Sequence, residues 1–305
     1  MNSRARVAPL ATALLAVGGC ATAPPPAVEF FDDFSYASAG ELAAGGWTVR
    51  DGSGHPGLPG GRFSADAITL ADDPDRPGNR VLRLTARTDG TGPGTVQAQL
   101  CHQRKVLAGT YAARVRFSDA PRSGPDGDFA VESFYAVASL AHAFDPDFSE
   151  LDWEYLPNGG WGSEKQRLYG VSWQTVQIEP WEAHNSAHEA FGSFAGWHVL
   201  LMQVADGRVT EFVDGRPFAV HGGRNVPVST MAIAFNLWFA TGGPLPEGGE
   251  PRVYDEDVDW VFHARDAVLS PSDVDAEVRR LQAARTARVD TLPAADPTRP
   301  ARCDF

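Results

Sequence analysis

Hydrophobic and polar residues alternate over many short stretches of the chain, and clusters rich in Gly, Pro, Asp and Ser separate these stretches. Residues 81–86 read Val-Leu-Arg-Leu-Thr-Ala, which is typical of a strand that buries one face. Asp214-Gly215 follows another such stretch and favours a tight hairpin turn. The pattern predicts a mostly β protein, with strands at 31–34, 81–86, 109–117, 128–138, 148–156, 168–176, 197–204, 208–213, 231–238 and 253–264.

One long helix is expected near the C-terminus. It begins near Ser272, whose side chain can cap the first turn together with Asp275 three residues later. Its apolar stripe consists of Val274, Val278 and Leu281. A polar tail with several prolines follows from 290 to 305. We expect the whole region 266–305 to pack on or beside the strands and to carry no chemistry of its own.

The composition is that of a folded protein, with 43% hydrophobic and 21% charged residues among 305. The 31 Gly and 23 Pro interrupt the chain too often for a helical bundle. A β sandwich of about 200 to 250 residues commonly forms one domain, and we expect this domain over 29–265. A formal charge of -13 disfavours nucleic acid and acidic polymers as partners, so a neutral substrate is expected. We also expect a monomer.

The first twenty residues are typical of a targeting segment. Arg4 and Arg6 precede the apolar run 7–17, which is too short for a membrane span, and Gly-Gly-Cys ends at Cys20. This resembles a bacterial lipoprotein signal, which implies cleavage before Cys20 and lipid on its sulfur. An ordinary secretory signal with an incidental cysteine is the alternative. We expect an exported protein, held at the cell surface or membrane by lipid alone, with residues 21–28 as a Pro-rich tether.

Two further cysteines remain once Cys20 is set aside. Cys101 and Cys303 are an even pair in an oxidising compartment, which suits a disulfide between the tail and the body of the protein. Two free thiols are the alternative, because sequence does not show whether the pair is close in space.

The most distinctive chemistry lies in the expected strand 148–156. Glu150, Asp152 and Glu154 alternate with apolar residues, so all three carboxylates face one side of the strand. The Cα atoms of the two glutamates are expected about 13 Å apart, which lets their carboxyls approach to about 5–6 Å. A retaining glycosidase needs about 5–5.5 Å between its two carboxyls. An ordinary half-exposed strand is the alternative, but its acidic face would need neighbouring Lys or Arg, and none follows before Lys165.

The segment 150–154 resembles the signature of the family 16 glycoside hydrolases, the laminarinase and lichenase group, in its form without a bulge residue. Further segments that fall in the family's order are 31–34, 109–115, 197–199, 212–215, 236–238 and 258–261. The resemblance covers 29–265 and implies an all-β, concanavalin-like jelly-roll sandwich of two curved antiparallel sheets. A cleft along the concave face would hold an extended β-glucan or galactan.

The resemblance also implies roles for individual residues. Glu150 would be the nucleophile, Glu154 the general acid and then base, and Asp152 would share a proton or hydrogen bond with Glu150. Neighbouring negative charge raises the pKa of Glu154 in the direction that a general acid requires. No cofactor is expected for this chemistry.

Aromatic side chains are expected along the cleft, because the C–H faces of sugar rings stack on them. Asn236 and Trp238 match the family's sugar-contact strand. Further candidates that follow the catalytic strand are Trp161, Trp173 and Trp181. Burial in the core is the alternative for each, and it is the expectation for Trp153, which faces away from the carboxylates.

Some positions depart from the family or fit other chemistry poorly. The link 158–162, Asn-Gly-Gly-Trp-Gly, replaces a short polar link, so the sugar-binding subsites are expected to differ. Asp259 matches the position of a structural calcium that the family often carries. His184 and His188 are four apart but lack the zinc-protease pattern, and we expect them in a solvated loop.

Together these features predict a surface-anchored, retaining endo-glycosidase that hydrolyses a neutral polysaccharide, a β-1,3- or β-1,3/1,4-glucan. One alternative is a cell-wall transglycosylase that uses the same carboxylates. Another is a carbohydrate-binding lipoprotein without catalytic activity.

Overall fold

The computed structural model describes residues 28–303. The expected signal segment, the lipidation site Cys20 and residues 21–27 of the expected tether lie outside the described residues. No helix within 28–303 is long and apolar enough to cross a membrane.

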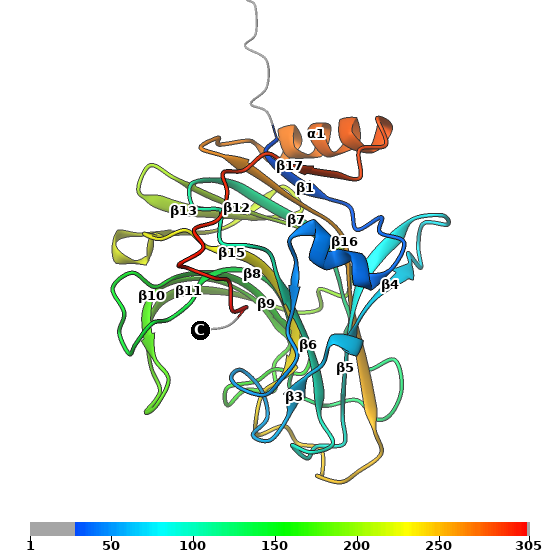
Figure 1. Ribbon diagram of the computed structural model, residues 1–305. Coiled ribbons are helices and arrows are strands. Elements are labelled where there is room, and N and C mark those ends of the chain that lie inside the picture. Colours follow the sequence, from blue (N-terminus) through cyan, green and yellow to red (C-terminus); the bar gives the residue numbers. More distant parts are fainter. Residues whose placement is uncertain (1–27, 304–305) are drawn as a thin grey trace, which may run out of the picture.

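The described chain is almost entirely β structure (Figure 1). Its strands are β1 (Phe30–Asp32), β2 (Thr48–Val49), β3 (Arg62–Phe63), β4 (Ile68–Asp72), β5 (Arg80–Thr88), β6 (Val96–Cys101), β7 (Gly109–Phe117), β8 (Ala130–Ala138), β9 (Ser149–Leu156), β10 (Arg167–Gln177), β11 (Glu182–Phe191), β12 (Gly196–Ala205), β13 (Arg208–Val213), β14 (Arg216–Gly222), β15 (Ala232–Phe239), β16 (Arg252–Arg265) and β17 (Arg288–Asp290). Its helices are α1 (Pro271–Ala283) and the 3-10 turns η1 (Ala39–Gly45), η2 (Ala65–Ala67) and η3 (Gly223–Asn225).

The strands form two curved layers packed face to face. In the first, which we call the outer layer, the order is β4-β5-β16-β7-β12-β13-β14. Strand β1 pairs with the C-terminal half of β16, at 261–263, and with β17. In the second, the cleft layer, the order is β2-β6-β15-β8-β9-β10-β11. Strand β6 also pairs with β3 and β5, which connects the layers at one edge. The fold is the jelly-roll sandwich that the sequence predicts.

The main core lies between the layers and follows the alternation of each strand. On β9 the side chains of Leu151, Trp153 and Tyr155 are fully buried there, which confirms the expected core position of Trp153. The indole ring of Trp153 packs on Phe218 of β14, with ring centroids 4.9 Å apart. The other face of β9 is thereby turned outward, toward the concave side of the cleft layer.

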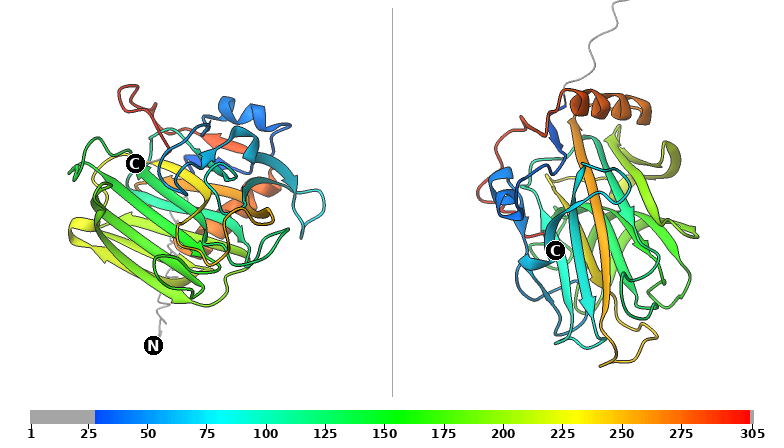
Figure 2. Two further views of the ribbon diagram at one scale, coloured as in Figure 1. Left: turned by 90° about the horizontal axis from the view of Figure 1, so that it is seen from below. Right: turned by 90° about the vertical axis from the view of Figure 1, so that its right-hand side faces the viewer.

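The C-terminal helix lies against the outer layer (Figure 2). Its buried stripe is the expected one, Val274, Val278 and Leu281. The expected cap was wrong by two residues, because Ser270 accepts the hydrogen bond from the backbone of Asp273 and Asp273 completes the capping box. Pro271 takes the first helical position, where a missing N–H costs nothing, and Ser272 follows within the first turn.

Strands with a clear alternation lie close to where the sequence predicts them, and 109–117 coincides with β7. Strand β11 was missed, because its sequence is polar or small on both faces. His184 and His188 therefore lie on an exposed strand and not in a loop, which corrects that expectation. Asp214-Gly215 does close the β13–β14 hairpin, and both residues have the positive φ that such a turn needs.

Candidate active site

The three carboxylates of β9 face a cavity on the concave side of the cleft layer. The cavity has a volume of about 550 Å³, and Glu150, Asp152 and Glu154 all line it. Strand β9 runs between β8 and β10, so each carboxylate has a ladder partner on both sides. Glu150 and Asp152 are largely buried, at 6% and 5% exposure, and Glu154 is partly exposed.

All of the sequence-predicted sugar-binding residues reach the same cavity. They are Asn236, Trp238, Trp161, Trp173 and Trp181. Trp161 and Trp181 are each 53% exposed, which is unusual for the largest apolar side chain and leaves part of each ring accessible from the cavity. The cavity thus combines an acidic floor with aromatic walls.

Trp173 connects the aromatic wall to the acidic floor. It lies opposite Glu150 on β10, and its indole Nε1 donates a hydrogen bond of 2.5 Å to Oδ2 of Asp152. Its ring also meets that of Trp181 edge to face, with centroids 6.2 Å apart. This tryptophan is therefore a partner of the carboxylate cluster as well as a wall of the cavity.

A row of polar side chains crosses the floor at the level of Glu154. Ladder pairing places Ser133 of β8 beside Glu154, Asn236 of β15 beside Ser133, and Gln99 of β6 beside Asn236. Ser133 and Gln99 were not predicted as site residues from the sequence. Residue parity along the expected strand 128–138 could have identified Ser133, whereas β6 was not recognised as a strand.

Several polar atoms on this floor have no hydrogen-bond partner among the described residues. They are Oε2 of Glu150, Oγ of Ser133 and Oδ1 of Asn236. A buried polar atom without a partner costs about 1–3 kcal/mol, so such atoms are normally satisfied by solvent or ligand. Since all three residues line the cavity, hydroxyl groups of a bound ligand are suitable partners.

Burial raises the pKa of every carboxyl in the cluster. It raises the pKa of Glu154 to about 7. It also raises the pKa of Glu150 and of Asp152 well above their usual range, and the negative charge of neighbouring carboxylates adds to the effect. The three groups therefore cannot all be ionised at neutral pH.

The hydrogen bonds decide how the remaining protons are shared. The bond from Trp173 lowers the pKa of Asp152, and a hydrogen bond between Glu150 and Asp152 raises the pKa of Glu150. These hydrogen bonds favour a proton on Glu150 over a proton on Asp152. Glu150 can become ionised when its proton moves to Asp152.

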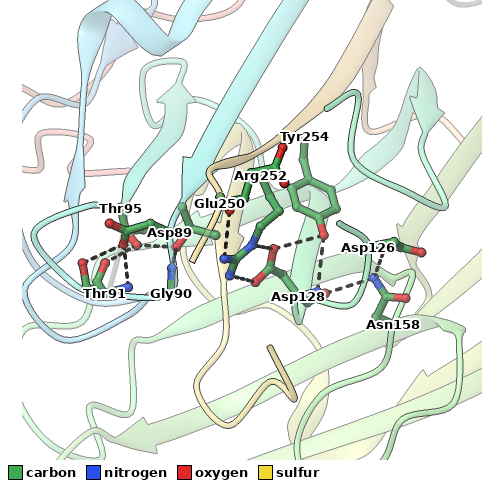
Figure 3. Close-up of polar contacts among 11 residues, drawn as sticks. Asp89, Gly90, Thr91, Thr95, Asp126, Asp128, Asn158, Glu250, Arg252 and Tyr254 are labelled. Carbon is green, nitrogen blue, oxygen red and sulfur yellow. Dashed lines mark hydrogen bonds and ion pairs between the residues drawn. The ribbon is translucent and has the colours of Figure 1, made fainter. Parts of the chain in front are cut away.

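The loop after β9 is anchored to a buried ion pair at the end of the sandwich (Figure 3). Nδ2 of Asn158 donates to Oδ1 of Asp126 at 2.9 Å and to the carbonyl of Asp128 at 3.2 Å. The carboxylate of Asp128 is held in turn by two nitrogens of Arg252, at 2.9 and 2.6 Å. This anchor fixes the base of the loop that carries Trp161.

A glycine is required in the same loop. Gly159 has φ of +83°, and a Cβ atom there would lie 2.1 Å from the carbonyl oxygen of Ser163. The loop doubles back at this point through paired backbone hydrogen bonds between Gly160 and Ser163. The departure from the family's link at 158–162 is thus a compact turn that presents Trp161 to the cavity.

A second loop reaches the cavity from the opposite edge of the cleft layer. Arg50 organises it by donating to the carbonyls of His55 and Ser53 and to Oε1 of Gln99. The ring of His55 stacks on Trp181, which follows β10, with centroids 5.7 Å apart. Both residues line the cavity, so its two walls meet at this contact. No sequence pattern pointed to His55.

Asp259 does not offer a calcium site. Its two carboxylate oxygens accept hydrogen bonds from Arg76 at 2.7 Å, Asn79 at 2.7 Å and Arg114 at 2.8 Å. The guanidinium groups of Arg76 and Arg114 neutralise the carboxylate of Asp259 as a calcium ion would. They also bind the carboxylate oxygens that calcium would need as ligands. Within 28–303 no group of three or more acidic, His or Cys side chains is arranged to hold a metal ion. The residues at this position therefore do not fit the calcium expected from the resemblance.

Cys101 and Cys303 are joined by a disulfide. Cys101 is the last residue of β6 and lies between β2 and β15 in the cleft layer, and Cys303 lines the cavity. The C-terminal tail therefore reaches the candidate site as well as packing beside the strands.

Comparison with solved structures identifies the fold. A Bacillus licheniformis beta-glucanase matches with a TM-score of 0.53 and 14% identity, over 78% of this chain and 99% of that one. A family 16 endo-glucanase from Bacteroides ovatus matches with a TM-score of 0.56 and 16% identity, over 76% and 98% of the two chains. A Mycobacterium tuberculosis protein described as an immunostimulatory antigen and pseudo beta-1,3-glucanase matches with a TM-score of 0.55 and 18% identity, over 78% and 99%. No protein-family model matches the sequence, and a search of curated proteins found no match.

Proposed function

We propose that this protein is a retaining glycoside hydrolase that acts on a neutral β-glucan with β-1,3 or mixed β-1,3/1,4 linkages. The observation that carries the proposal is the shared cavity of Glu150, Asp152 and Glu154, walled by tryptophans and floored by unsatisfied polar atoms. The substrate class rests on the fold, because proteins of this fold include β-glucanases that act on such polymers by their descriptions.

In the first step, the carboxylate of Glu150 attacks the anomeric carbon while Glu154 gives its proton to the leaving oxygen. The bond from the anomeric carbon to that oxygen breaks, and a glycosyl ester of Glu150 forms. A pKa of about 7 keeps a large share of Glu154 protonated near neutral pH, as a general acid requires. Asp152 takes the proton of Glu150, which ionises the nucleophile and leaves the net charge of the pair unchanged.

In the second step, Glu154 takes a proton from water as that water attacks the anomeric carbon. The ester bond to Glu150 breaks, and the sugar is released with its original anomeric configuration. Because the charge of Glu150 is absent from the ester, Glu154 no longer faces this negative neighbour when it acts as a base. A sugar hydroxyl in place of water would give the transglycosylase that the sequence left as an alternative.

A panel of purified polysaccharides tests the proposal, scored for new reducing ends and for the anomer released first. The wild type is expected to release reducing ends from a β-glucan with retention. Glu150→Gln is expected to keep glycan binding and to lose turnover by at least about 10³-fold. Inversion, or unchanged turnover in Glu150→Gln, would contradict the mechanism.

A carbohydrate-binding protein without turnover is the second candidate. Two observations favour it: burial raises the pKa of all three carboxyls, and one matching structure is described as a pseudo beta-1,3-glucanase. Glycan binding by both the wild type and Glu150→Gln, with no reducing ends from either, would support this candidate.

We also propose that the protein is an exported monomer, anchored to a membrane by lipid on Cys20, with its glycosidase domain over 29–265. The Cys101–Cys303 disulfide supports export, because such bonds persist in oxidising compartments. Metabolic labelling with a fatty acid is expected to mark the wild type and not Cys20→Ser. Label that persists in Cys20→Ser would contradict the anchor.

A further inference from the structure

The last described residues lie inside the candidate site. After β17 the chain buries Leu292 in the main core and then runs toward the concave side of the cleft layer (Figure 1). We call residues 293–303 the C-terminal segment. Its end packs onto the concave face, where Ala301 and Cys303 join an apolar cluster that includes Val137 and Trp173. Cys303 is only 1% exposed, so the segment is seated in the face and does not merely pass over it.

The segment is fixed there by a covalent bond and by hydrogen bonds. The disulfide attaches Cys303 to Cys101 on β6. The carbonyl oxygen of Cys303 also accepts a hydrogen bond of 2.6 Å from Nε2 of Gln99 and one of 2.5 Å from the hydroxyl of Tyr135. Oε1 of Gln99 is occupied as well, by Arg50 at 2.7 Å. Two polar side chains of the cavity floor, Gln99 and Tyr135, are thus hydrogen-bonded to the segment.

Both side chains lie on the cavity floor, on the β6 side of the carboxylates. Tyr135 is the ladder neighbour of Asp152, one strand away. Gln99 ends the row that begins at Glu154, and with strands about 4.8 Å apart it lies about 14 Å from β9. On the β6 side of the catalytic strand, the floor available to a ligand therefore ends at the C-terminal segment. Ser133 and Asn236, which lie before it, keep their unpartnered polar atoms.

We infer that the disulfide-held C-terminal segment is an end wall of the glycan cleft and confines cleavage to the neighbourhood of a chain end. The inference rests on the proposed function. A long glucan bound across Glu150 and Glu154 cannot continue past Tyr135 and Gln99, because the main chain of Cys303 occupies that path. The substrates are therefore chain ends and oligosaccharides, and attack near an end replaces the internal, endo-type attack expected from the sequence.

Removal of the wall tests the inference. One variant ends at Pro293 and keeps the buried Leu292. A second, Cys101→Ser with Cys303→Ser, keeps the segment but removes the disulfide that attaches it to β6. Arg299→Ala is the matched control, because its ion pair with Asp147 at 3.9 Å is exposed and lies away from the cavity lining. Near-ultraviolet circular dichroism establishes that each variant is folded.

Binding of a β-glucan oligosaccharide series is measured in the Glu150→Gln background. With the wall present, affinity is expected to stop rising at a short length. In the chain that ends at Pro293, affinity is expected to keep rising with length, so that the longest oligomers bind about tenfold more tightly than they bind the chain with the wall. In the active enzymes, the viscosity of a long glucan is expected to fall faster per reducing end once the wall is absent, and Arg299→Ala is expected to match the wild type.

The two proposals fail in different ways. The end wall alone is overturned if the chain ending at Pro293 is folded and active but behaves as the wild type does. Its affinity would then stop rising at the same oligosaccharide length, and viscosity would fall by the same amount per reducing end. If that truncation does not fold, the double serine variant gives the same decision. Absence of glycan binding and cleavage in the wild type and in both variants overturns the proposed function and the end wall with it.

Discussion

The indole nitrogen of Trp173 on β10 donates a 2.5 Å hydrogen bond to Oδ2 of Asp152 on the neighbouring strand β9. This bond stabilises the charged form of Asp152 and lowers its pKa, against the effects of burial and of Glu154. It therefore influences where the shared proton of Glu150 and Asp152 resides.

Trp173→Phe is expected to reduce kcat by about 10- to 100-fold, because Asp152 loses the hydrogen bond that holds its carboxyl in position beside Glu150 while an aromatic wall remains. Loss of the donor raises the pKa of Asp152, so the acid limb of the rate profile is expected to move to higher pH. Steady-state kinetics from pH 4 to pH 9 measures both effects. Trp161→Phe is the control, because the structure gives it no hydrogen bond to the cluster, and an equal shift of its acid limb would contradict the assignment.

Activity is expected to decline as pH rises through about 7. Glu154 must carry a proton for the first step, and its pKa is raised to about 7 by burial. Glu154→Gln is expected to lose cleavage of natural glucan. It is expected to keep a rapid first release of the aryl group from an activated aryl glycoside, because that leaving group needs no proton, although later turnover slows without the base. Equal loss of the first step on both substrates would show that Glu154 is not the general acid.

The cluster is expected to cost stability at neutral and higher pH. Glu154 titrates near its ordinary pKa of 4.5 in the unfolded chain and at about 7 in the fold, so the folded state binds more protons between these values. Stability contributed by the protonated carboxyl is present below pH 4.5 and is lost as pH rises through 7. Glu154→Gln is therefore expected to raise the free energy of unfolding at pH 8 by on the order of 1–3 kcal/mol, with little change at pH 4.

Thermal unfolding at both pH values checks this prediction. Glu164→Gln, outside the cavity, is the matched control and is expected to show no such difference between pH 4 and pH 8. If Glu154→Gln is less stable than the wild type at pH 8, the ionised carboxylate of Glu154 does not destabilise the fold, and the prediction is wrong.

Chelation of divalent cations is expected to leave Tm unchanged. The carboxylate of Asp259 is bound by Arg76, Asn79 and Arg114, so no calcium is required to neutralise it. Calorimetry with EDTA and with added calcium provides the measurement. A rise of several degrees with calcium would show that the ion binds in a way that these contacts do not explain.

The sequence predicted the parts of the site that depend on strand parity. Glu150, Asp152 and Glu154 share a face because alternation is a property of any strand, and Trp153 is buried for the same reason. Asn236 could be placed in the cleft by the same reasoning together with the family resemblance.

The parts that were missed depend on distant segments of the chain. His55 reaches the cavity through the hydrogen bonds of Arg50, and Cys303 reaches it through a disulfide across 202 residues. Asp259 occupied the expected position, but its arginine partners come from other strands and loops. Periodicity along one strand contains no information on such contacts.

The proposed mechanism requires a covalent bond between Glu150 and the sugar. A glucan oligosaccharide with fluorine at C2 and an activated leaving group slows breakdown of that bond, so the ester accumulates and its site can be found by peptide mass spectrometry. One added glycosyl group is expected on the peptide that contains Glu150, and none in Glu150→Gln. Label on a different residue, or hydrolysis of the natural substrate with inversion and no label, would contradict it.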